Sequence, residues 1–112
     1  MNIAITTQGQ SLDSRVNPRF GRASWFILYN TEDESWQAFE NPAETQRGGA
    51  GIAAAQFLAD KGVETAISGR FGPNAHQALS AAGIKMVMFE DKEQTAREVI
   101  DDFLAERLSK PA

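Results

Sequence analysis

The fold is decided by residues 50–89, which read AGIAAAQFLADKGVETAISGRFGPNAHQALSAAGIKMVMF. Helical periodicity alternates in this stretch with short apolar runs that are typical of buried strands. Each of the two expected helices ends where a glycine, Gly62 or Gly83, can adopt the left-handed conformation that closes a helix. Strands are expected over residues 65–68 and 84–89. Because strand–helix–strand crossovers are right-handed and produce parallel strands, this stretch predicts an α/β protein.

Three further strands precede this stretch and one helix follows it. Apolar and aromatic runs predict strands at residues 3–5, 25–29 and 36–40. Asp91 and Gln94 resemble a capping box that opens a C-terminal helix. The apolar stripe of that helix comprises Ala96, Val99, Ile100, Phe103 and Leu104. The element order β-β-β-α-β-α-β-α, with the second strand antiparallel to the other four, predicts a mixed five-stranded sheet with three helices.

The composition fits one globular domain, expected over residues 1–108 with a short C-terminal tail at 109–112. Of its 112 residues, 42% are hydrophobic and 23% are charged. No apolar run approaches the roughly 20 residues of a spanning helix, and no basic leader precedes the first strand, so we expect a cytoplasmic protein without a membrane partner. The net charge of −4 argues against nucleic acid as a partner. The absence of cysteine excludes zinc fingers, cysteine-ligated iron–sulfur centres and cysteine nucleophiles.

A basic segment interrupts this acidic chain at residues 15–26, which read RVNPRFGRASWF. Guanidinium groups are rigid, permanently charged and fork-shaped, so several on one short loop suggest a captured anion. The expected loops at residues 7–23, 41–49 and 69–73 all leave the carboxyl edge of the sheet, where open α/β sheets bind ligands. These loops carry Arg15, Arg19, Arg22, Arg47 and Arg70.

Two glycine-rich segments in these loops lead into helices, at residues 46–51 (QRGGAG) and 68–75 (SGRFGPNA). Backbone N–H groups at a helix N-terminus form an anion site, although glycines that serve only packing or turns give the same pattern. Neither segment is a Walker motif or a dinucleotide-binding motif. The predicted site comprises Arg15, Asn17, Arg19, Phe20, Gly21, Arg22, Arg47, Gly48, Gly49, Ala50, Arg70, Phe71, Gly72 and Asn74.

The remaining candidate groups do not form a catalytic set. His76, the single histidine, is a candidate metal ligand, but solvent exposure or hydrogen bonding in the first turn of its helix explains it as well. Met86 and Met88 carry thioethers that bind soft copper, yet their spacing favours core filling. The central strands end without paired carboxylates, and no Ser-His-Asp arrangement is visible. The site is therefore expected to hold a ligand rather than to transform one.

Five short motifs follow one another along nearly the whole chain: SLDS at 11–14, RFGRA at 19–23, GGAGI at 48–52, GPNA at 72–75 and AGI at 82–84. In this order they resemble the dinitrogenase iron–molybdenum cofactor biosynthesis family, which includes nitrogenase accessory proteins and the orange protein of sulfate-reducing bacteria. The resemblance implies a ribonuclease-H-like sheet with strand order 3-2-1-4-5. It also implies binding of a metal–sulfur cluster that contains molybdenum. Stand-alone domains without cysteine are similar to the orange protein, and this likeness implies a molybdenum–copper sulfide cluster held without covalent protein ligands.

The residues and the resemblance together predict a non-catalytic carrier or scaffold for an anionic metal–sulfur cluster. In this hypothesis Arg19 and Arg22 supply charge, the glycine loops supply amide donors, and Phe20 and Phe71 form an apolar wall. Acceptor or regulatory proteins are expected as partners. Two alternatives stay open: an interaction module that binds a partner through the acidic C-terminal helix, and an enzyme acting on a phosphorylated small molecule, for which acid–base residues are lacking.

Overall fold

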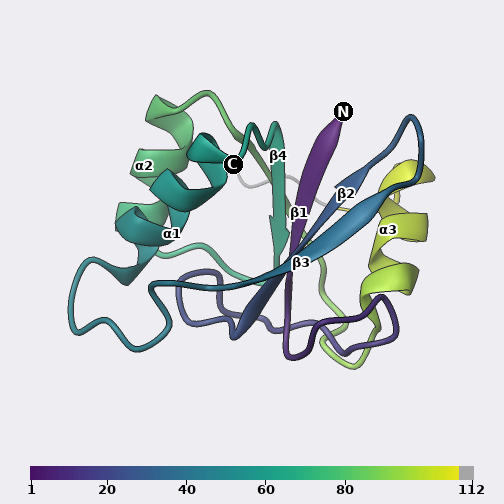
Figure 1. Ribbon diagram of the computed structural model, residues 1–112, viewed down its shortest axis with the longest axis horizontal. Helices are drawn as coiled ribbons and strands as arrows, with labels where there is room; N and C mark the ends of the chain where they lie inside the picture. The colour runs from purple at the N-terminus through teal and green to yellow at the C-terminus, as the bar shows by residue number, and fades with distance from the viewer. Residues whose placement is uncertain (109–112) are drawn as a thin grey trace.

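The chain forms a five-stranded mixed sheet with helices on both faces (Figure 1). The structure is a computed structural model that describes residues 1–108; the expected C-terminal tail at 109–112 lies outside the described residues. The strand order β3-β2-β1-β4-β5 is the predicted order 3-2-1-4-5. The elements are β1 (Asn2–Thr7), β2 (Trp25–Asn30), β3 (Trp36–Glu40), α1 (Ala50–Asp60), β4 (Thr65–Ser68), α2 (Pro73–Ala81), β5 (Lys85–Met88) and α3 (Ala96–Leu104).

Strand directions place the three predicted site loops at one edge of the sheet. β2 pairs antiparallel with both β1 and β3, while β4 lies parallel to β1 and to β5. The strands β1, β3, β4 and β5 therefore share one direction, as the crossovers predicted. Their carboxyl ends lie at the lower side of Figure 1, where the loops that follow β1, β3 and β4 meet.

The core lies in two layers because the central strands are buried on both faces. Ala4 and Ala66 face α1 and α2, where they belong to one core cluster with Phe20, Phe26 and Leu58 of α1. Ile3, Ile5 and Ile67 face α3, where they pack with Val99 and Ile100. Such two-sided burial explains why the central strands read as continuous apolar runs rather than as alternating ones.

Glycine ends both helices of the crossover region, as the sequence predicted. Gly62 and Gly83 both have φ 74°, the left-handed conformation in which glycine carries no Cβ penalty. The N–H of Gly62 donates to the carbonyl of Ala59 and that of Val63 to the carbonyl of Leu58, each at 3.1 Å. These two bonds satisfy carbonyls that the end of α1 would otherwise leave unpaired.

The capping box of the C-terminal helix is not the predicted one. Asp91 and Gln94 precede the helix, and the box is formed by Thr95 and Glu98, whose side chains each accept a hydrogen bond from the backbone N–H of the other. Residues 94 and 95 instead pair with the loop after β1: the carbonyl of Gln94 accepts a hydrogen bond from the N–H of Val16 at 3.0 Å, and Thr95 forms an antiparallel bridge with Arg15. Pairing with the loop after β1 therefore delays the start of α3 by about one turn.

Within residues 1–108, no helix has both the length and the apolar character to cross a membrane.

Candidate functional site

A cleft of about 240 Å³ lies where three segments converge at the carboxyl edge of the sheet. The loop after β1, the N-terminus of α1 and the segment from β4 into α2 each contribute to its wall. Its lining comprises Arg19, Phe20, Gly21, Arg22, Gly49, Ala50, Gly51, Arg70, Gly72, Pro73, Asn74 and Ala75. The structure thus brings together most of the predicted site residues.

Backbone hydrogen bonds connect the loop after β1 to the end of β4. Arg19 and Arg70 form a parallel bridge, and the N–H of Phe20 donates to the carbonyl of Arg70 at 3.2 Å. The Asn17 side-chain oxygen accepts from the N–H of Arg19 at 3.0 Å, which closes a local turn. The buried Thr6 hydroxyl donates to the carbonyl of Asn17 at 2.6 Å and so ties this turn to β1. Asn17 therefore supports the cleft without lining it.

Close approach of three backbones requires glycine in the cleft wall. A Cβ on Gly21 would lie 3.0 Å from the backbone nitrogen of Gly51, and a Cβ on Gly51 would lie 2.8 Å from the Cβ of Ala75. Larger residues would push α1 away from the loop after β1 and from α2. Of these lining residues, sequence reasoning left out Ala75, whereas Gly51 and Pro73 lie within the segments 48–51 and 72–74 that it assigned to the site. Gly51 lies in the glycine-rich motif that was recognised, whereas the small size of Ala75 carries no signal by itself.

Arg22 acts as a clamp on the loop that leads into α1. Its Nη1 donates to the carbonyl oxygen of Glu44 at 3.1 Å and to that of Gln46 at 2.6 Å. Ser24 adds a hydroxyl donor to the Glu44 carboxylate at 2.9 Å. Since its guanidinium lines the cleft while holding two backbone carbonyls, Arg22 shapes the site as well as contributing charge to it.

Arg19 and Arg70 provide two exposed guanidinium groups on the cleft without a protein counter-charge. Within residues 1–108, neither side chain makes a hydrogen bond or an ion pair. Elsewhere on the surface three arginines pair with carboxylates: Arg15 with Glu93 at 2.6 Å, Arg97 with Asp13 at 3.5 Å and Arg107 with Asp102 at 3.1 Å. Within residues 1–108 the exposed Arg47, outside the cleft, makes no ion pair either. Like charges on bridged neighbouring residues repel each other, so a bound anion would relieve the repulsion between Arg19 and Arg70.

Two helix N-termini open into the same cleft with their first amides uncapped. α1 begins after Gly49 and α2 begins after Gly72, and neither helix has a side-chain cap or an acidic residue in its first turn. α3, which lies away from the cleft, has a complete capping box. Unpaired N–H groups and the positive ends of two helix dipoles thus face a cavity that also carries two guanidiniums.

Five predicted residues do not line the cleft. Arg15 is held in its ion pair with Glu93, and Asn17 supports the turn described above. Arg47 and Gly48 lie exposed on the loop before α1. Phe71 packs behind the wall, with its ring 5.2 Å from the ring of Phe20. 

His76 also lies outside the cleft and lines a second cavity. The chain described here, residues 1–108, holds no group of three or more His, Cys, Asp or Glu side chains placed to bind a metal ion. The volume of the cleft corresponds to about eight water molecules at roughly 30 Å³ each. That is below the roughly 300 Å³ at which pockets for drug-sized ligands begin. The cleft therefore suits a small, compact anion better than a nucleotide.

The fold and the cleft define a small α/β domain with a basic site at the carboxyl edge of its sheet. Residues 1–106 match the dinitrogenase iron-molybdenum cofactor family, and the chain belongs to that family. It is similar to the apo form of the orange protein from Desulfovibrio gigas, with 41% identity, a TM-score of 0.92, and coverage of 99% of this chain and 92% of that one. It also resembles a Thermotoga DUF35-family protein described as a candidate NifB protein, with 39% identity, a TM-score of 0.85 and coverage of 97% and 91%. A comparison with curated proteins finds no match.

Proposed function

We propose that this protein binds and carries an anionic metal–sulfur cluster in the cleft, without catalysing a reaction on it. Membership of the dinitrogenase iron-molybdenum cofactor family supports a role connected with such clusters. The similarity to the orange protein over nearly the whole chain supports a stand-alone carrier. In this proposal the cargo contains molybdenum, and a molybdenum–copper sulfide is its most specific form.

The observation that carries the proposal is the pair of guanidiniums without counter-charge, Arg19 and Arg70, beside two uncapped helix N-termini. Sulfide ligands spread negative charge over large, polarizable atoms. Guanidinium is weakly hydrated and planar, so it pairs with such a surface at a smaller desolvation cost than an ammonium group. The backbone amides of α1 and α2 add hydrogen bonds that need no side chain.

Non-covalent capture also agrees with the amino-acid content of the chain. The sequence contains no cysteine, so no protein thiolate can ligate a metal in the cluster. Charge and hydrogen bonding hold a cluster reversibly, which suits transfer to an acceptor protein. We further propose that the carrier works in the cytoplasm and that release involves exchange with a protein whose metal ligands bind more tightly.

Titration of the apo-protein with tetrathiomolybdate and Cu(I), followed by gel filtration, tests this function. A coloured complex of fixed stoichiometry should co-elute with the protein. The double variant Arg19→Gln/Arg70→Gln should bind at least tenfold more weakly, because a charge-assisted hydrogen bond contributes about 1.5–3 kcal/mol. The single variant Arg97→Gln is the matched control, since it removes an arginine that pairs with Asp13 away from the cleft.

Two results would contradict the proposal. The first is a chromophore that separates completely from the wild-type protein on the column. The second is equal retention by the cleft variant and the Arg97 control, which would place the bound metal elsewhere. Loss of retention at high salt in the wild type would agree with capture by charge.

A further inference from the structure

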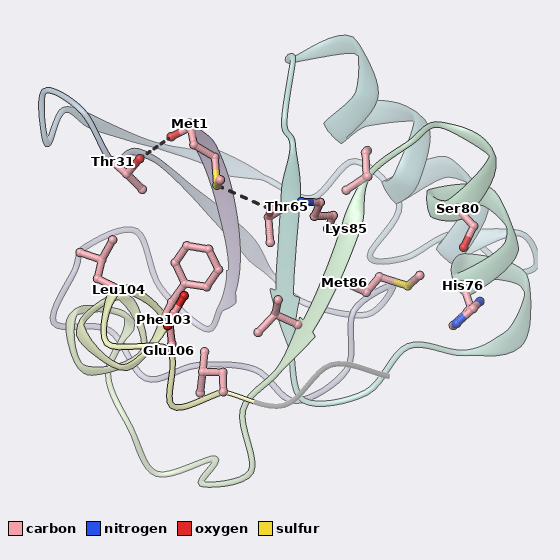
Figure 2. A pocket seen from close by; sticks show the side chains of 13 residues that line it. Met1, Thr31, Thr65, His76, Ser80, Lys85, Met86, Phe103, Leu104 and Glu106 are labelled. Atoms are coloured by element: carbon pink, nitrogen blue, oxygen red, sulfur yellow. Dashed lines mark hydrogen bonds between the residues drawn. The ribbon is translucent and has the colours of Figure 1, made fainter. Parts of the chain in front are cut away.

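A second cavity, of about 920 Å³, lies at the β5 side of the sheet and has no part in the proposed cluster site (Figure 2). Residues at the beginnings of β4 and β5, Thr65 and Lys85, contribute to its lining. It therefore extends to the end of the sheet opposite the cleft. α2 contributes His76 and Ser80, β5 contributes Met86, and α3 contributes Phe103 and Leu104.

Two metal-ligating side chains, a soft thioether and an imidazole, lie toward each other in this cavity. In Figure 2 the thioether of Met86 extends from β5 toward the imidazole ring of His76 on α2. Both residues are half buried, so neither donor is sealed in the core. The ammonium group of Lys85 leaves the strand on the opposite side, because consecutive side chains of a strand alternate between faces. Met1, the other thioether of the cavity, lies apart and accepts a hydrogen bond from the Thr65 hydroxyl at 3.8 Å.

Met86 and Met88 are both half buried, and lining of the cavity is what distinguishes Met86. Its neighbour Val87 also borders the cavity but packs against the α3 side of the sheet, with 5% of its surface exposed. Met86 packs partly against the α1–α2 side and keeps the rest of its surface toward the cavity. Met88, two residues further and on the same face of β5, does not line the cavity. Met86 is thus positioned for a ligand in the cavity, and Met88 serves as a reference residue on the same strand.

We infer that His76 and Met86 form a binding site for a soft monovalent cation, Cu(I) or its analogue Ag(I). Thioether sulfur selects Cu(I) among biological cations, and imidazole nitrogen is a common copper ligand. Zinc requires four ligands and calcium or magnesium six or more oxygens, whereas the described part of the chain holds no cluster of three His, Cys, Asp or Glu for such ions. His76 follows directly after Ala75, which lines the cleft, so a cation held there would lie next to the N-terminus of α2.

Titration of the apo-protein with silver nitrate alone tests this site independently of any cluster. The methionine methyl and histidine ring signals are followed by NMR, and Cu(I) affinity is measured by competition with a chromogenic Cu(I) chelator. We expect the Met86 methyl and His76 ring signals to shift together and to saturate at one Ag(I) per chain. Met86→Leu, which conserves volume, and His76→Gln should each weaken Cu(I) binding more than roughly tenfold. Roughly tenfold is the loss in metal affinity when a residue that only orients a metal ligand is removed, so loss of a ligand itself should exceed it.

Met88→Leu is the control and should leave both the shifts and the affinity unchanged. Thermal unfolding of each variant checks that the fold is retained. The inference is overturned if Met1 or Met88 responds to silver as strongly as Met86, or if Met86→Leu binds Cu(I) as tightly as the wild type. Because no thiomolybdate is present, a negative result here leaves the proposed cluster site standing, and loss of cluster binding leaves this site standing.

Discussion

Replacing Arg22 by glutamine should release the loop that leads into α1. Arg22 Nη1 donates to two backbone carbonyls, those of Glu44 and Gln46, at 3.1 and 2.6 Å. Hydrogen bonds from a charged donor contribute about 1.5–3 kcal/mol each. The guanidinium is only half buried and Ser24 also holds Glu44. We therefore assign about 2 kcal/mol to both bonds together, which corresponds to ~30-fold in the opening equilibrium of the loop.

Amide hydrogen exchange of the apo-protein measures this opening directly. The N–H of Gln46, which donates to the carbonyl of Ala43 at 3.1 Å, should exchange ~30-fold faster in Arg22→Gln. The N–H of Ile84, at the far end of α2, should keep its rate. Arg47→Gln is the matched control because it removes an equal charge from the loop that Arg22 holds, and the Arg47 guanidinium makes no hydrogen bond within residues 1–108. Equal acceleration in both variants, or none in Arg22→Gln, would refute the clamp.

Three further perturbations test the fold around the site. Gly69→Ala should lower the free energy of unfolding in urea by about 1–3 kcal/mol, because the new Cβ would lie 2.9 Å from the Cα of Pro18. Thr95→Ala should lower the free energy of unfolding by about 1 kcal/mol because it removes the capping box of α3. The exposed control Thr45→Ala should stay within about 0.5 kcal/mol of the wild type. Equal urea midpoints for Gly69→Ala, Thr95→Ala and Thr45→Ala would contradict the first two expectations. Burial, followed by nearby carboxylates, raises the pKa of the Tyr29 phenol above its usual 10.0. The folded state therefore holds the Tyr29 proton more tightly than the unfolded state does. The contribution of protonated Tyr29 to the free energy of unfolding is complete below pH 10.0 and should be lost as the pH rises through the pKa of the folded state. The Tyr29→Phe variant should lack this pH dependence.

Local sequence patterns were sufficient for the element order and the strand directions. Strand β3 and strand β4 begin and end at the predicted residues, and Gly62 and Gly83 end their helices as expected. These features depend on periodicity and on turn residues within a few positions of each other. Thr95 and Glu98 carry the local Thr-x-x-Glu pattern of a capping box, which sequence reasoning passed over in favour of Asp91 and Gln94. The hydrogen bond between Gln94 and Val16, far apart in the chain, accompanies the later start of α3.

For the arginines around the candidate cleft, the sequence predicted their location and the tertiary structure determined their contacts. Sequence and crossover handedness alone placed five arginines in loops at one edge of the sheet, because strand direction determines which end each loop leaves. Only the tertiary structure separates their roles. Arg15 pairs with Glu93, 78 positions away, and Arg22 holds carbonyls 22 and 24 positions away. Arg19 and Arg70 become neighbours through a bridge between distant segments and keep their charges free for a ligand. The partner of a long, flexible side chain is chosen by packing between segments remote in sequence, and no local pattern encodes that choice.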